Sequence, residues 1–74
     1  MNILILAAVS CYGLSQDQMN YCFAREKHDV GFCYSIFDPS LRTTCRAEIE
    51  RSPGACDGIT NIDERQLCRN KASN

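Results

Sequence analysis

Apolar residues recur at helical spacing along the chain that follows residue 15. In two stretches they stand three or four positions apart, which places them on one face of an α-helix. They are Met19, Cys22 and Phe23 in the first stretch, and Leu41, Cys45 and Ile49 in the second. A third stretch has a similar length, but its Ile62 and Leu67 do not form a single narrow stripe. We therefore expect three helices, over residues 16–28, 39–51 and 62–72.

Two short breaks separate the expected helices. Residues 29–31 end with Gly31, and residues 52–54 contain Pro53 followed by Gly54, which are residue types that interrupt helices. The apolar segment 32–37 lies between the first break and the second helix. Its pattern fits a short helix and an extended packing segment equally well.

The three helical stretches are copies of one repeat. A shift of 23 residues superposes five sets of positions: Cys22 on Cys45 and Cys68, Cys33 on Cys56, Gly31 on Gly54, Ala24 on Ala47, and Ile36 on Ile59. A residue preferred at helix N-caps stands seven positions before each of Cys22, Cys45 and Cys68: Ser15, Asp38 and Asn61. We expect an all-α fold, a small disulfide-rich three-helix bundle built from a helix–turn–Cys repeat of 23 residues. A stack of helical hairpins is the close variant.

Six cysteines in 74 residues indicate a disulfide framework. A domain of this size buries too little surface to be stable without cross-links, and such a framework persists outside the reducing cytosol. The expected pairs lie within one repeat, where the chain doubles back: Cys22 with Cys33, and Cys45 with Cys56. Cys68 then pairs with Cys11 or with a second subunit, which leaves a disulfide-linked homodimer open.

The N-terminal apolar run is typical of a secretory signal. Residues 3–9 are uncharged and far too few to span a bilayer, which takes about 20 apolar residues. Gly13 and Ser15 supply the small side chains that signal peptidase selects. We expect a signal peptide over residues 1–15, and a secreted, disulfide-stapled helical domain over residues 16–74.

This cleavage site conflicts with the repeat. Cleavage after Ser15 removes Cys11, whereas the repeat assigns Cys11 to the disulfide framework, so the retention of Cys11 stays open. Ala8-Val9-Ser10 before Cys11 also fits a lipoprotein signal in which Cys11 is acylated, although no basic residue precedes the apolar run.

The charge of the chain is balanced, with eight basic and nine acidic residues and a net charge of −1. Without a basic block, we expect no nucleic-acid partner and no membrane-lytic role. Two pairs of arginines stand at equivalent positions with a spacing of four: Arg42 with Arg46, and Arg65 with Arg69. These pairs are candidates for binding an acidic partner surface, and local salt bridges to residues such as Glu50 are the alternative.

Catalytic, metal and cofactor chemistry find little support in the sequence. Zinc sites use cysteines two to four residues apart, whereas no two cysteines here are closer than eleven positions. The one histidine, His28, has no ligand at metal-binding spacing, and a Cys–His nucleophile needs a thiol outside the disulfides. We expect no enzyme, no metal site and no cofactor.

The aromatic residues leave two roles open. They are Tyr21, Phe23, Phe32, Tyr34 and Phe37, and they form either core or a recognition surface. Small size, secretion and the absence of a catalytic set favour an extracellular binding or signalling ligand of toxin, pheromone or effector type. Its partner is then an extracellular receptor or channel. The alternatives are a structural component of a secreted, disulfide-linked complex, and a small inhibitor or carrier.

Overall fold

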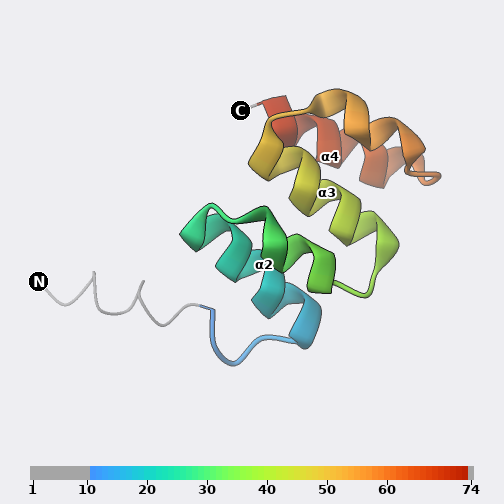
Figure 1. Cartoon of the computed structure of the whole chain (residues 1–74). Helices are drawn as coiled ribbons and strands as arrows, with labels where there is room; N and C mark the ends of the chain where they lie inside the picture. Colours follow the sequence, from blue (N-terminus) through green and yellow to red (C-terminus); the bar gives the residue numbers. More distant parts are fainter. Residues whose placement is uncertain (1–10, 74) are drawn as a thin grey trace, which may run out of the picture.

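The computed structural model describes residues 11–73, which form helices and turns without a strand. Three α-helices lie side by side, and two 3₁₀-helices connect them (Figure 1). The elements in chain order are α2 (Gln16–Lys27), η1 (Val30–Ser35), α3 (Pro39–Glu50), η2 (Pro53–Gly58) and α4 (Ile62–Ser73). The expected all-α bundle is confirmed, and each α-helix begins at the expected residue.

The helices stack in one layer with α3 in the middle. The 3₁₀-helix η1 packs against α2 and α3, and η2 packs against α3 and α4 in the same way. Because each 3₁₀-helix carries the chain back along the bundle, the three α-helices run in the same direction (Figure 1). Their N-termini therefore gather at one edge of the layer.

The three predicted N-caps are confirmed. In each helix the cap side chain accepts a hydrogen bond from the backbone N–H three residues later. The pairs are Ser15 with Gln18 at 3.3 Å, Asp38 with Leu41 at 2.8 Å, and Asn61 with Glu64 at 2.9 Å. The repeated cap fixes where each helix begins, and therefore where its cysteine lies.

The first two α-helices end within one residue of the expected positions, and the expected last residues, His28 and Arg51, are left-handed C-caps. His28 has φ 54° and Arg51 has φ 53°. Each is followed by a residue whose N–H bonds back to the last turn, Asp29 to Ala24 at 3.0 Å and Ser52 to Ala47 at 2.9 Å. This geometry satisfies the free carbonyls of a helix C-terminus. Gly31 and Pro53 lie inside the 3₁₀-helices that follow.

The disulfides join Cys11 to Cys22, Cys33 to Cys45, and Cys56 to Cys68. The expected pairing of Cys22 with Cys33 and of Cys45 with Cys56 is therefore wrong, and Cys68 does not bond to Cys11 or to another subunit. The reason lies in the chain path, because each connecting segment runs alongside the helix that follows it. Its cysteine thus meets the middle of that helix, with Cα atoms 5.4–5.8 Å apart.

Cys11 belongs to the framework of the described chain. Its side chain is buried, with 4% exposed, and it is bonded to Cys22 in α2. The expected signal peptide falls mainly on residues 1–10, which lie outside the described residues. Its last five residues, 11–15, form the turn that leads into α2.

Two small cores repeat the same positions. The first contains Tyr21, Ala24, Cys33, Ile36 and Cys45, and Val30, Phe32, Leu41 and Ile49 pack against it. The second contains Ala47, Cys56, Ile59, Cys68 and Ala72, with Ala55 packed against it. Every member of the second core lies 23 residues after a member of the first core or, for Ala72, after Ile49, which packs against it. The interior thus consists mainly of disulfides, small alanines and isoleucine, with Tyr21 added in the first core, and the small side chains let neighbouring helices approach closely.

Polar residues occupy the equivalent positions on the two end faces of the stack. Ala24 and Ala47 are fully buried under the next unit, whereas the equivalent residue of α4 is the exposed Asn70. At the other end, α2 carries exposed Glu26 where α3 has the core residue Ile49. The described stack therefore ends in polar faces on both sides, as terminal units of repeat proteins do.

Candidate functional site

A pair of side chains lies beside each disulfide, on the side of the layer that we call the outer face. In every unit, the residue after the first cysteine contacts the residue after the second. The three pairs are Tyr12 with Phe23, Tyr34 with Arg46, and Asp57 with Arg69. Equivalent positions thus hold an edge-to-face aromatic pair, a cation–π pair and an ion pair.

The first two pairs form the aromatic–arginine surface, in which Tyr12 and Tyr34 are exposed and Phe23 and Arg46 are half-buried. The ring centroids of Tyr12 and Phe23 are 5.5 Å apart, and the Arg46 guanidinium carbon is 5.4 Å from the Tyr34 centroid. Tyr12 remains 66% exposed and Tyr34 59% exposed. Tyrosine and arginine side chains dominate the binding energy of many protein interfaces. The disulfides beside them reduce the entropy lost when a partner binds.

The four candidate arginines have separate local surroundings. Arg42 donates a hydrogen bond to the Ile36 carbonyl at 2.9 Å, and Arg69 is neutralised by Asp57. Arg46 lies on Tyr34, and Arg65 is half-buried. Of the four, Arg46 is the one that contacts an exposed aromatic ring, that of Tyr34.

The five candidate aromatic residues divide between core and surface. Tyr21 is buried, while Phe23 and Phe32 are half-buried with ring centroids 5.6 Å apart. Tyr34 is exposed, and so is Phe37, at 78%. Sequence reasoning missed Tyr12 as a surface residue because it falls inside the expected signal peptide. Tyr12 could have been identified by its position directly after a cysteine, which it shares with Tyr34.

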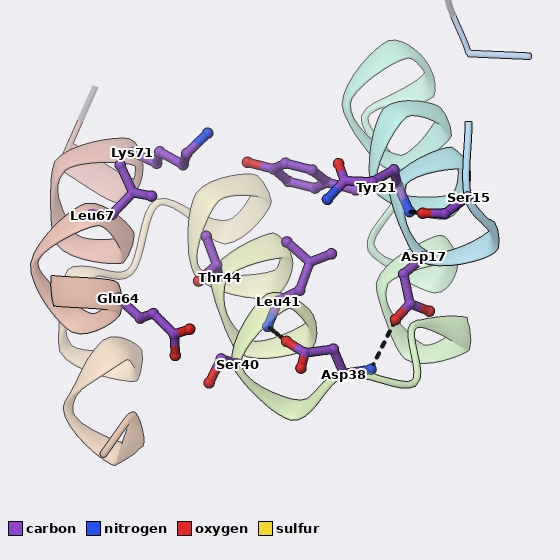
Figure 2. A pocket seen from close by; sticks show the side chains of 11 residues that line it. Ser15, Asp17, Tyr21, Asp38, Ser40, Leu41, Thr44, Glu64, Leu67 and Lys71 are labelled. Carbon is purple, nitrogen blue, oxygen red and sulfur yellow. Dashed lines mark hydrogen bonds between the residues drawn. The ribbon is translucent and has the colours of Figure 1, made fainter. Parts of the chain in front are cut away.

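A groove of about 500 Å³ lies on the opposite side of the layer. Its floor is α3, with Leu41 and Thr44, and its walls are α2 and α4 (Figure 2). Equivalent positions of the three helices line it in two rows: Gln18, Leu41 and Glu64, and Tyr21, Thr44 and Leu67. Phe23 of the outer face lies about 200° around α2 from Tyr21, so the groove and the aromatic–arginine surface face opposite ways.

The wall of the groove at α2 is fixed by a buried tyrosine. The Tyr21 hydroxyl donates a hydrogen bond to Glu48 of α3, whose carboxylate also pairs with Arg25 at 3.1 Å. Burial raises the pKa of Tyr21 far above its usual value, and the hydrogen bond and negative charge of Glu48 raise it further. Tyr21 is therefore a neutral donor, and the Lys71 ammonium lies 5.3 Å from its ring centroid.

Charges in the groove follow the direction of the helices. At the N-terminal end lie Asp17, Asp38 and Glu64, and Lys71 lies toward the C-terminal end (Figure 2). The Asp17 carboxylate accepts hydrogen bonds from the backbone N–H groups of Phe37 and Asp38, at 2.8 and 3.0 Å. Carboxylates at this end also balance the positive ends of three parallel helix dipoles.

Other kinds of site find no support in the part of the chain that the structure describes. No group of three or more potential metal ligands occurs among residues 11–73. None of the helices in this range has the length and apolar character that crossing a membrane requires. His28 is an exposed residue at the end of α2, outside both the groove and the aromatic–arginine surface.

Comparison with known proteins adds no relative to this picture. No family model, no curated protein and no solved structure matches the chain.

Proposed function

We propose that this protein is a secreted, disulfide-stabilised helical mini-protein that binds an extracellular receptor or channel, as a ligand of toxin, pheromone or effector type. It acts by binding, without catalysis or a cofactor. The contact surface is the aromatic–arginine surface. Tyr12 and Tyr34 are its anchors, and Arg46 is the charged residue that faces the bound partner.

One observation carries the proposal. Two tyrosines more than half exposed stand at equivalent positions, each next to a disulfide and each in contact with a side chain of the following helix. Exposed tyrosine rings on a rigid support are effective anchors for a binding partner. Three intrachain disulfides also support an oxidising, extracellular environment.

The proposal includes Cys11 in the mature protein. Cleavage after Ser15 would separate Cys11 from Cys22 and leave the first unit without its cross-link. Cleavage after Ser10 preserves the bond, and Ala8 and Ser10 supply small residues at the two positions that the peptidase selects. All six cysteines pair within the chain, so a covalent homodimer and a disulfide-linked complex are not part of the proposal.

Expression with its own leader in a secretory host tests the first half of the proposal. The secreted product should begin at Cys11, and its intact mass should fall below that of the reduced chain by two hydrogens for each of three disulfides. Retention inside the cell, or a product that begins at Gln16, would contradict this half.

Binding to cells tests the second half. The fluorescently labelled, oxidised protein should bind saturably to the surface of target cells, and unlabelled protein should displace it. Y12A and Y34A together should weaken this binding by about tenfold or more. The matched control is F37A, which removes an exposed ring outside the aromatic–arginine surface. Equal losses in the two variants, or binding that the reduced and alkylated chain retains, would contradict the proposed surface.

A further inference from the structure

The side of α4 that faces the groove carries a stripe of three residues, Glu64, Leu67 and Lys71. Their spacing of three and four keeps them within about 60° of one another around the helix. Glu64 and Lys71 are about 10 Å apart along the axis, and Leu67 lies between them with 54% of its surface exposed. An acidic, an apolar and a basic residue thus follow one another along one wall of the groove (Figure 2).

Neither charge of this stripe has an ion-pair partner within the described chain, and Lys71 lies over the Tyr21 ring across the groove. Two ion pairs occur among residues 11–73, and neither includes Glu64 or Lys71. Asp38, which caps α3, is a second acidic residue at the same end of the groove as Glu64. The groove therefore has an acidic end and a basic end, separated by apolar surface.

This arrangement is complementary to itself. When a second α4 lies antiparallel to the first, the order of charges is reversed, so each Glu64 meets the Lys71 of the other copy. Leu67 then meets its own equivalent near the two-fold axis. We infer that two copies of this chain associate without a covalent bond, through antiparallel α4 helices that enter each other's groove. Such a two-fold, self-complementary contact is the commonest form of closed association.

The surroundings of the stripe fit a helix as the occupant. No Cα atom of α2 lies within 8 Å of a Cα atom of α4, so the two walls stand apart above α3. Leu41 on the floor extends the apolar centre that Leu67 begins. The incoming Lys71 reaches the end that holds both Glu64 and Asp38.

The polar end faces of the stack favour this lateral contact over end-to-end stacking, because Asn70 and Glu26 replace the residues that pack between units. The inference does not depend on the proposed function. The dimer leaves both aromatic–arginine surfaces free, since they lie on the opposite side of each layer.

Charge reversal tests the inference. The oxidised wild-type protein should show a concentration-dependent monomer–dimer equilibrium in sedimentation velocity up to millimolar concentrations. Each of E64K and K71E places like charges opposite each other twice in the symmetric dimer, and should raise the dissociation constant by about tenfold or more. An equimolar mixture of E64K and K71E should form a heterodimer, because both reciprocal ion pairs are then restored. The double variant E64K/K71E should again form a homodimer.

The controls are E50K and K27E, which make the same charge changes at exposed positions of α3 and α2 outside the groove, and which should leave the equilibrium unchanged. Circular dichroism and intact mass show that each variant is folded and fully oxidised. A wild-type protein that stays monomeric at millimolar concentration would overturn the inference. A dimer that survives both single reversals, or single variants whose mixture fails to associate, would overturn it as well.

Discussion

The guanidinium of Arg46 lies over the ring of Tyr34, 5.4 Å from its centroid, and each residue directly follows a cysteine of the disulfide between Cys33 and Cys45. The same two positions hold different chemistry in the other units. Because the contact persists while its chemistry changes, the disulfide and the helix start set its geometry. The side chains at these positions can therefore vary to suit a partner without altering the fold.

A double-mutant cycle on these pairs should separate their energies. We expect a coupling of about 0.5–1 kcal/mol between Tyr34 and Arg46 from Y34A, R46A and the double variant in urea unfolding. The pair of Asp57 and Arg69 is about half exposed, so its coupling should be smaller, at a few tenths of a kcal/mol. Salt should reduce this second coupling more strongly, because an ion pair in water is screened. Equal couplings with equal salt dependence would contradict the distinction.

Removal of the first and of the second disulfide should lower the free energy of unfolding by different amounts. The bridges close loops of nearly equal length, with sequence separations of 11, 12 and 12, so the chain-entropy term is about 3 kcal/mol for each. Cys33 and Cys45 are also members of the first core, whereas Cys11 and Cys22 belong to neither core. We therefore expect C33A/C45A to lower the free energy of unfolding more than C11A/C22A does. Thermal unfolding under oxidising conditions measures the difference, and the reverse order would contradict this account.

The helix starts could be predicted from sequence because their signals are local. Ser15, Asp38 and Asn61 are cap residues at a fixed distance before a cysteine, and the structure uses all three as caps. Disulfide pairing is not local in this sense. It depends on which helix the connecting segment lies against, and the repeat is equally compatible with the preceding and the following helix.

Burial was harder to predict than helix position. Leu67 and Tyr21 stand at equivalent positions of the repeat, yet Tyr21 is buried between α2 and α3 while Leu67 lies on the open wall of the groove. Tyr21 lies against the next helix, α3, where Glu48 accepts its hydrogen bond, whereas the described stack has no further helix beyond α4 to cover Leu67. The groove could have been located from the 23-residue shift, since equivalent positions must line a common face of parallel helices.

The left-handed residues that end α2 and α3 offer a route to stabilisation. His28 and Arg51 have φ values of 54° and 53°, a conformation that costs an L-residue with a Cβ atom about 1 kcal/mol. H28G and R51G should each raise the free energy of unfolding by about 0.5–1 kcal/mol, after the added flexibility of glycine in the unfolded chain is included. H28A keeps the Cβ atom and should give no such gain. Urea unfolding compares the three variants, and a loss of stability in both glycine variants would contradict the role of these residues as C-caps.

Tyr21 should make the stability of the protein fall in alkaline solution. Burial, followed by the hydrogen bond to Glu48, raises the pKa of its hydroxyl well above the value of 10.0 that applies to an exposed tyrosine. Below pH 10 the group is neutral in both the folded and the unfolded chain. Above pH 10 the unfolded chain loses this proton while the folded chain keeps it, so the free energy of unfolding decreases by up to about 1.4 kcal/mol per pH unit. Y21F removes the titrating group and should flatten this decline, whereas Y12F removes an exposed hydroxyl and should not. Urea unfolding between pH 9 and 11, on oxidised protein without free thiol, provides the measurement, and equal slopes for Y21F and the wild type would show that Tyr21 titrates alike in both states.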